Sequence, residues 1–282
     1  MDKNKQQTIK PGLYLVSTPI GNISDITYRC LNILNKSDII LCEDTRRSLK
    51  LLSHYKIKNK LLPYHKFNEK KLIDKIISYL KNDKIIALIS DAGTPTISDP
   101  GTMLVSKCID ENLSIYPIPG PSAVTSAISI SGFSGKYLFY GFLDKKENEL
   151  EKELKNLSEF DCSLVFFVPA VKINFYISKF KKYFIDRKIV IAKEMTKIHE
   201  EFIRANVDKI ESFPTNLKGE LTIVLSKRII NKKKRKEIDE SVKIEIKEML
   251  KKYSHKDVTD FISKKENLPK KLIYNYCLTL KK

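Results

Sequence analysis

The stretch Ile85-Ile86-Ala87-Leu88-Ile89 passes directly into Ser90-Asp91-Ala92-Gly93-Thr94-Pro95, and a helix-period segment follows over residues 103–109. A continuous apolar run of this length is typical of a strand that is buried on both faces of a sheet. A loop with glycine and proline that leads from such a strand into a helix is typical of α/β proteins. The stretch therefore predicts a mostly parallel sheet covered by helices.

The same alternation extends along the chain in both directions. Strands are expected at residues 13–17, 39–42, 85–89 and 115–118, and helices at 26–34, 72–80 and 103–109. A second set has strands near 138–143, 164–168, 188–192 and 221–225 and helices around 150–157 and 173–180. Between the sets stands Pro117-Ile118-Pro119-Gly120-Pro121, whose prolines and glycine cannot continue a strand or helix interior. The sequence therefore predicts two α/β lobes that join near residue 118.

The C-terminal part of the chain has a different pattern. The basic run Lys232-Lys233-Lys234-Arg235-Lys236 has no apolar periodicity, and Ser254-x-x-Asp257 has the form of a helix-capping box. Apolar residues recur at helical spacing on both sides of Pro269, which favours a helix start. We predict a disordered lead-in over residues 1–10, an N-terminal α/β lobe over 11–118, a C-terminal α/β lobe over 119–228, and a basic linker with a small helical appendage over 229–282.

The composition is that of a soluble globular protein with a large basic excess. Of 282 residues, 42% are hydrophobic and 30% are charged, and the formal net charge is +18. No apolar run is long enough to span a bilayer, and the five scattered cysteines are expected to be reduced packing residues, so we predict a cytoplasmic protein without a membrane partner. The excess favours a polyanionic partner, although a bias toward Lys, Ile and Asn also produces it. Residues 227–282 hold 18 basic and 8 acidic side chains, and this concentration favours nucleic acid.

Three loops follow directly on expected strands of the first sheet. They are Ser17-Thr18-Pro19-Ile20-Gly21-Asn22, Ser90-Asp91-Ala92-Gly93-Thr94-Pro95 and Pro119-Gly120-Pro121-Ser122-Ala123. Ligands of open α/β sheets bind outside the carboxyl ends of the strands, where such loops converge. One such loop is most simply a tight turn, but three on the same sheet edge predict a ligand site.

Several other kinds of site lack their motifs. The sequence contains neither the GxxxxGK[ST] loop of nucleoside triphosphatases nor the GxGxxG fingerprint of dinucleotide folds. The four histidines are scattered and no HExxH is present, so no protein-held metal is expected. No GxSxG motif suggests a serine hydrolase.

Ordered blocks along the chain resemble those of ribosomal RNA small-subunit methyltransferase I, a family of the tetrapyrrole methylase superfamily. The resemblance runs from about Pro11 to the end of the chain. The blocks are Leu15-Val16-Ser17-Thr18-Pro19-Ile20-Gly21-Asn22, Cys42-Glu43-Asp44-Thr45-Arg46, Ser90-Asp91-Ala92-Gly93-Thr94-Pro95-x-x-Ser98-Asp99-Pro100-Gly101, Pro119-Gly120-Pro121-Ser122-Ala123, Glu194-Met195-Thr196-Lys197 with Glu200-Glu201, and Gly219-Glu220-Leu221-Thr222. The segment 166–172 departs from the family pattern, because it lacks the expected acid and histidine.

The resemblance implies a fold, a cofactor and a reaction. It implies two α/β lobes, S-adenosylmethionine in the cleft between them, and a homodimer. It further implies methylation of a cytidine 2′-hydroxyl in the decoding region of 16S ribosomal RNA, either as RNA or in the assembled small subunit. By motif position, the cofactor would be surrounded by Pro19, Gly21, Asp91, Gly93, Thr94, Ser122, Ala123, Gly219, Glu220 and Leu221.

A ribose hydroxyl is a poor nucleophile, so a base or a cation near the developing alkoxide would help methyl transfer. We expect Lys197 and Glu194 to face the ribose, and Asp44 and Arg46 to shape the substrate side of the cleft. The competing interpretation of each is a surface salt bridge. Two other functions remain open on the sequence: a superfamily methyltransferase that acts on a tetrapyrrole or other small substrate, and a non-catalytic RNA-binding or ribosome-assembly protein.

Overall fold

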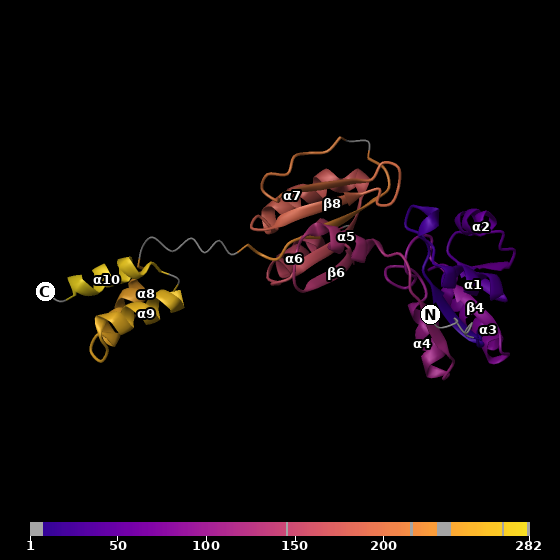
Figure 1. Cartoon of the computed structure of the whole chain (residues 1–282), viewed down its shortest axis with the longest axis horizontal. Helices are drawn as coiled ribbons and strands as arrows, with labels where there is room; N and C mark the ends of the chain where they lie inside the picture. Colours follow the sequence, from indigo (N-terminus) through magenta and orange to yellow (C-terminus); the bar gives the residue numbers. More distant parts are fainter. Residues whose placement is uncertain (1–7, 145, 215–216, 230–237, 267, 281–282) are drawn as a thin grey trace, which may run out of the picture. The chain divides into compact units, whose positions relative to one another are not determined.

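The computed structural model describes residues 8–144, 146–214, 217–229, 238–266 and 268–280 (Figure 1). Two compact units are present, residues 1–228 and residues 229–282. Most of the expected disordered lead-in and the whole basic run 232–236 lie outside the described residues. No described helix is long and apolar enough to cross a membrane.

The first sheet is fully parallel. Its strands lie in the order β3-β2-β4-β1-β5, with β1 at Gly12–Val16, β2 at Ile39–Cys42, β3 at Lys60–Pro63, β4 at Ile85–Leu88 and β5 at Ile115–Ile118. Side chains of the central strands pack on α3 (Glu69–Lys81) and α4 (Thr102–Asp110) on one face. On the other face they pack on α1 (Tyr28–Lys36) and α2 (Thr45–His54), so the sheet is covered on both sides.

Two features of this sheet differ from the expectation. Pro117 lies inside β5, paired with Leu15, and not in the hinge. Because β5 is an edge strand, proline is tolerated there. The strand β3 and the helix α2 were not expected. β3 escapes prediction because it is a four-residue, partly exposed edge strand that ends in proline.

The second sheet has the order β6-β7-β10-β8-β9 and is mostly antiparallel, so the prediction of a mostly parallel sheet is wrong for it. Only β6 (Tyr137–Phe142) and β7 (Ser163–Pro169) pair in parallel. The short connection from β8 (Lys188–Lys193) to β9 (Glu201–Asn206) cannot make a parallel crossover, which requires a dozen or more residues. The sheet is completed by β10 (Glu220–Leu225), and its faces pack on α6 (Glu147–Ser158) and α7 (Ile173–Tyr183) and on α5 (Ala123–Ser131).

Residues 229–282 form a separate helical unit. It contains α8 (Glu240–Met249), α9 (His255–Glu266) and α10 (Lys270–Thr279). Its buried core is drawn from these helices and the connecting segments, and includes Ile246, Ile262 and Ile273. The Asp257 N–H donates to Ser254 Oγ over 3.2 Å, which places Ser254 as the expected cap of α9. The apolar stripes of α9 and α10 thus stabilise this unit itself.

Candidate cofactor and substrate site

The first two sequence-predicted loops are joined at the carboxyl edge of the first sheet. Thr18 and Gly93 form an isolated antiparallel bridge, in which each N–H donates to the other's carbonyl oxygen over 2.8 and 3.0 Å. The hydroxyls of Ser17 and Thr94 are 3.0 Å apart. Thr18 is buried and its hydroxyl donates to the Ser90 carbonyl. The loops that follow β1 and β4 are therefore one rigid structure.

The third loop joins them through Thr94, whose hydroxyl donates to the Pro121 carbonyl over 3.3 Å. Gly120 packs on Ser17 so closely that a Cβ would lie 2.8 Å from Ser17 Cβ. Ser122 and Ala123 follow at the start of α5, where Ser122 is the N-cap and makes no side-chain capping bond. The structure thus brings together the sequence-predicted residues of all three loops.

Gly93 has a backbone conformation that favours glycine. Its φ of +84° lies in the left-handed region, and a Cβ would meet no other atom closer than 3.5 Å. A Cβ would make ordinary contacts with Ile20 and Pro121, so the left-handed conformation by itself explains the glycine without any ligand.

Gly21 faces a loop of the second lobe. A Cβ on Gly21 would lie 2.6 Å from Thr196 Oγ1 and 2.7 Å from Lys197 Cγ, and the neighbouring Asn22 N–H donates to Thr196 Oγ1 over 2.9 Å. Glu194 and Thr196 have φ angles of +51° and +65°. A left-handed conformation is uncommon outside glycine, and such backbone strain clusters at functional sites.

Glu194 and Lys197 form an ion pair with 3.0 Å between Oε1 and Nζ. Glu194 also lies against the last sequence-predicted block, Gly219-Glu220-Leu221-Thr222, because a Cβ on Gly219 would be 3.5 Å from its Oε1. The next residue, Glu220, begins β10 and pairs with Pro169. Leu221 is buried in the core of the second lobe and pairs with Val168 and Lys193 on the neighbouring strands, so its side chain packs in the core and does not face a ligand.

Asp44 and Arg46 form an ion pair with each other at the start of α2. The Asp44 carboxylate caps α2 and accepts from the Arg46 backbone N–H over 2.9 Å, and Arg46 Nη2 lies 2.8 Å from Asp44 Oδ2. These bonds hold the pKa of Asp44 well below its usual range, and the Arg46 side chain is 87% exposed. Asp91 connects this turn to the second loop, since its Oδ1 accepts from the Asp44 N–H over 3.2 Å.

A group of carboxylates surrounds Asp99, a residue for which the sequence suggested no role. Burial, reinforced by the negative charges of Glu43, Asp91 and Glu220, raises the pKa of Asp99 to about 6. Burial also raises the pKa of Glu43. Since Glu220 belongs to the second lobe and the others to the first, the group spans both lobes. Among the described residues, no group of His, Cys, Asp or Glu has the arrangement to hold a metal ion.

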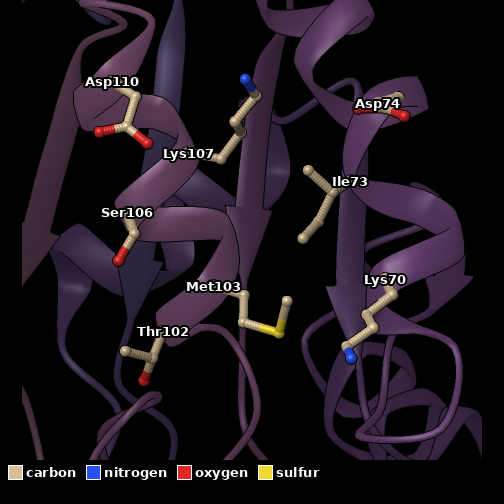
Figure 2. Close-up of a pocket in the computed structure, with 8 residues that line it drawn as sticks. All are labelled: Lys70, Ile73, Asp74, Thr102, Met103, Ser106, Lys107 and Asp110. Atoms are coloured by element: carbon tan, nitrogen blue, oxygen red, sulfur yellow. The ribbon is translucent and has the colours of Figure 1, made fainter.

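A separate pocket of about 430 Å³ lies between α3 and α4 (Figure 2). Its lining includes Lys70, Ile73, Met103 and Lys107, and Figure 2 shows that these side chains come from the two helices. None of the sequence-predicted site residues lines it.

Known proteins are similar to this chain in sequence and in fold. Residues 12–211 match the family model of "Tetrapyrrole (Corrin/Porphyrin) Methylases". The "Ribosomal RNA small subunit methyltransferase I" of Mesomycoplasma conjunctivae is 45% identical over 78% of this chain and 94% of its own length. That of Thermotoga maritima is 44% identical over 76% of this chain and 97% of its own length. The chain belongs to the ribosomal RNA small subunit methyltransferase I family of the tetrapyrrole methylases.

Solved structures of the superfamily share the fold at low sequence identity. A uroporphyrin-III C-methyltransferase from Thermus thermophilus has a TM-score of 0.55 at 13% identity and covers 77% of this chain and 94% of its own. The methyltransferase CobJ has a TM-score of 0.59 at 14% identity and covers the same shares. The prediction of a two-lobed tetrapyrrole methylase fold with a C-terminal helical appendage is confirmed, as is the family resemblance.

We predict that Gly21→Ala separates the two loops that meet at Thr196. The added methyl overlaps Thr196 and Lys197, so we expect a loss of roughly 1–3 kcal/mol in the free energy of unfolding. Ser24→Ala, just after the same loop, is the control. The Ser24 side chain is exposed, and its hydrogen bond to Asn22 Oδ1 is donated by the backbone N–H, which the substitution keeps. Chemical denaturation measures both variants. Equal stability of Gly21→Ala and wild type would show that the loops do not meet at this point.

We also predict a pH-dependent stability that depends on Asp99. The pKa of Asp99 in the folded protein, about 6, exceeds the ordinary value of 3.8. The folded protein therefore binds more protons between these values, and its free energy of unfolding falls as pH rises through this window. Replacement by Asn should remove this fall, on the order of 1–3 kcal/mol.

Glu111→Gln supplies the comparison of opposite sign. Ion pairs with Lys107 and Lys81 lower the pKa of Glu111 to about 2, so its contribution is present above pH 4.5 and lost as pH falls toward 2. Denaturation curves at several pH values distinguish the two. An Asp99→Asn curve parallel to wild type from pH 4 to 6 would contradict the assignment.

Proposed function

We propose that this chain methylates the 2′-hydroxyl of a cytidine in the decoding region of 16S ribosomal RNA, with S-adenosylmethionine as the methyl donor. The supporting observation is its identity of up to 45% to proteins named ribosomal RNA small subunit methyltransferase I, over nearly their whole length. We further propose that the protein is cytoplasmic and acts as a homodimer, as the family resemblance implies.

The three joined loops fit the proposed cofactor. The Thr18–Gly93 bridge and the Thr94–Pro121 bond hold the three loops together, and the α5 N-terminus beside Ser122 offers N–H donors. Asp91, Asp99 and Glu220 give the site a negative charge that suits a sulfonium cation. When bound, S-adenosylmethionine supplies an electrophilic methyl group.

The chain's part in the reaction is to position the ribose and to stabilise charge. We propose that the Lys197 ammonium stabilises negative charge on the ribose 2′-oxygen as the hydroxyl gives its proton to solvent and the oxygen takes the methyl group, whose bond to the donor sulfur breaks. Glu194 would hold Lys197 in place, since the two side chains are 3.0 Å apart. Asp44 and Arg46 would together fix the turn that contacts Asp91. The exposed Arg46 side chain would in addition face the RNA.

The alternatives differ in what they predict for methyl transfer. A methyltransferase for a small substrate would bind the cofactor but not methylate small ribosomal subunits, and an RNA-binding protein would methylate nothing. The assay is transfer of a radiolabelled methyl group to subunits that lack the modification, followed by localisation of the label in the RNA. Absence of label in small-subunit RNA would refute the proposed function.

We predict that Lys197→Ala lowers the rate of methyl transfer on the order of 10²-fold at saturating cofactor and RNA, with little change in either dissociation constant. Lys193→Ala is the matched control, because Lys193 forms a similar ion pair with Glu201 at the end of β8. Single-turnover kinetics separate turnover from binding. Weaker RNA binding with unchanged turnover would reassign Lys197 to substrate docking.

We propose that residues 229–282 dock on RNA. Their helical core is self-contained, and the family model ends at residue 211, so the methylase fold does not depend on them. Exposed lysines of this unit include Lys247, Lys264 and Lys271 on the helices and Lys252 in the turn between α8 and α9. Each cation that neutralises a phosphate releases a counterion, so binding through them depends on salt.

We therefore predict that deletion of residues 229–282 leaves cofactor affinity and the unfolding of the remaining chain nearly unchanged. The truncated protein should bind small subunits more weakly and with a smaller dependence on salt concentration. Calorimetry with the cofactor, thermal unfolding and subunit binding at several salt concentrations measure these effects. A folded truncation with the full-length affinity and salt slope would contradict the docking role.

A further inference from the structure

Three large apolar side chains are almost wholly exposed. Tyr28, Phe67 and Ile198 are 93%, 90% and 96% exposed. Every other large apolar side chain among the described residues is at most 69% exposed. Exposed apolar residues that stand out in this way require an explanation when they gather at one place.

Each of the three adjoins the loops of the candidate site. Tyr28 begins α1, where the nearby Cys30 Sγ lies 3.8 Å from the Pro119 carbonyl oxygen of the third loop. Phe67 is two residues before Glu69, whose buried carboxylate accepts from the Gly101 N–H. Gly101 ends the segment that leads from the second loop to α4. Ile198 follows Lys197, whose Cγ packs at Gly21 in the first loop.

Val171, the next most exposed at 69%, has a similar position. It follows Ala170, whose N–H donates to the Gly219 carbonyl over 2.9 Å. The exposed apolar residues thus come from four separate segments, and in each segment a neighbouring residue contacts one of the site's loops.

A basic residue stands next to each of these side chains in the sequence. Arg29 follows Tyr28, Lys66 precedes Phe67, Lys197 precedes Ile198 and Lys172 follows Val171, and all four cations are exposed. Alternating apolar and cationic side chains are typical of surfaces that bind single-stranded nucleic acid, on which bases stack and phosphates are neutralised. Sequence-specific RNA recognition mostly uses such unpaired bases.

We propose that Tyr28, Phe67 and Ile198 form a rim that docks the unpaired segment of RNA around the target nucleotide. The rings of Tyr28 and Phe67 stack on bases, Ile198 packs against a sugar or base, and the exposed cations Arg29 and Lys66 contact phosphates. This inference rests on the proposed function, and it adds the residues that hold the substrate.

Charge favours RNA over a second copy of the chain at this surface. The formal net charge is +18, and each apolar residue of the rim has an exposed cation beside it. Apposition of two such surfaces would place cations against cations, which is unfavourable, whereas a polyanion neutralises them.

The test compares Tyr28→Ala and Phe67→Ala with wild type on small ribosomal subunits that lack the modification. We expect KM for the subunits to rise about tenfold in each variant, because a base stacked on an aromatic side chain contributes roughly 1–3 kcal/mol. The dissociation constant of S-adenosylmethionine should stay unchanged. Phe67→Tyr should restore most of the affinity, since it keeps the aromatic ring. Thermal unfolding should not change, because neither ring is buried.

Tyr137→Ala is the matched control, since Tyr137 is an exposed aromatic residue at the start of β6 and not one of the rim residues. Sedimentation of all variants tests whether a second copy of the chain, and not RNA, covers this surface. Unchanged KM in both rim variants would overturn the inference while methylation by wild type would leave the proposed function intact. A shift from dimer to monomer in the rim variants would also overturn it, because the surface would then be an interface between copies.

Discussion

The paired hydrogen bonds between Thr18 and Gly93 are the interaction on which the site depends. In a parallel sheet, neighbouring strands deliver their following loops to the same edge, but nothing in the sheet fixes those loops to each other. The Thr18–Gly93 bridge does so between adjacent strands β1 and β4. Thr94 then extends the connection to the loop after β5. The bridge requires the left-handed backbone of Gly93, so a local conformation holds three distant segments of sequence together.

Much of this edge could be predicted from the sequence, because each loop follows a continuous apolar strand. The strands β1, β2, β4 and β5 were expected within one or two residues of their observed bounds. A parallel sheet then places the loops after β1, β4 and β5 at the same edge. The family blocks indicated which loops surround the expected cofactor, and apolar periodicity alone does not indicate this.

What could not be predicted depends on contacts between distant residues. The antiparallel second sheet follows from the short connection after β8, in a region where the strand β9 was not expected. Asp99 acquires its raised pKa from burial and from carboxylates that the fold brings near it, and its own segment gives no sign of this. Leu221 matched a cofactor block, but its side chain serves the core. Sequence position therefore identified the neighbourhood of the site better than the role of each side chain.

The distribution of charge suggests how such a site could separate its two ligands. The carboxylates around Asp99 come from both lobes, whereas Arg29 and Lys66 are exposed cations beside the exposed rings of Tyr28 and Phe67. A polyanion is attracted to the outer cations and repelled by the inner carboxylates, while a small cation is attracted to the carboxylates. Under the proposed function, this arrangement keeps phosphates at the rim and lets only an unpaired nucleotide approach the cofactor. The net positive charge of the chain and the negative charge of its cleft are then complementary parts of one binding mechanism.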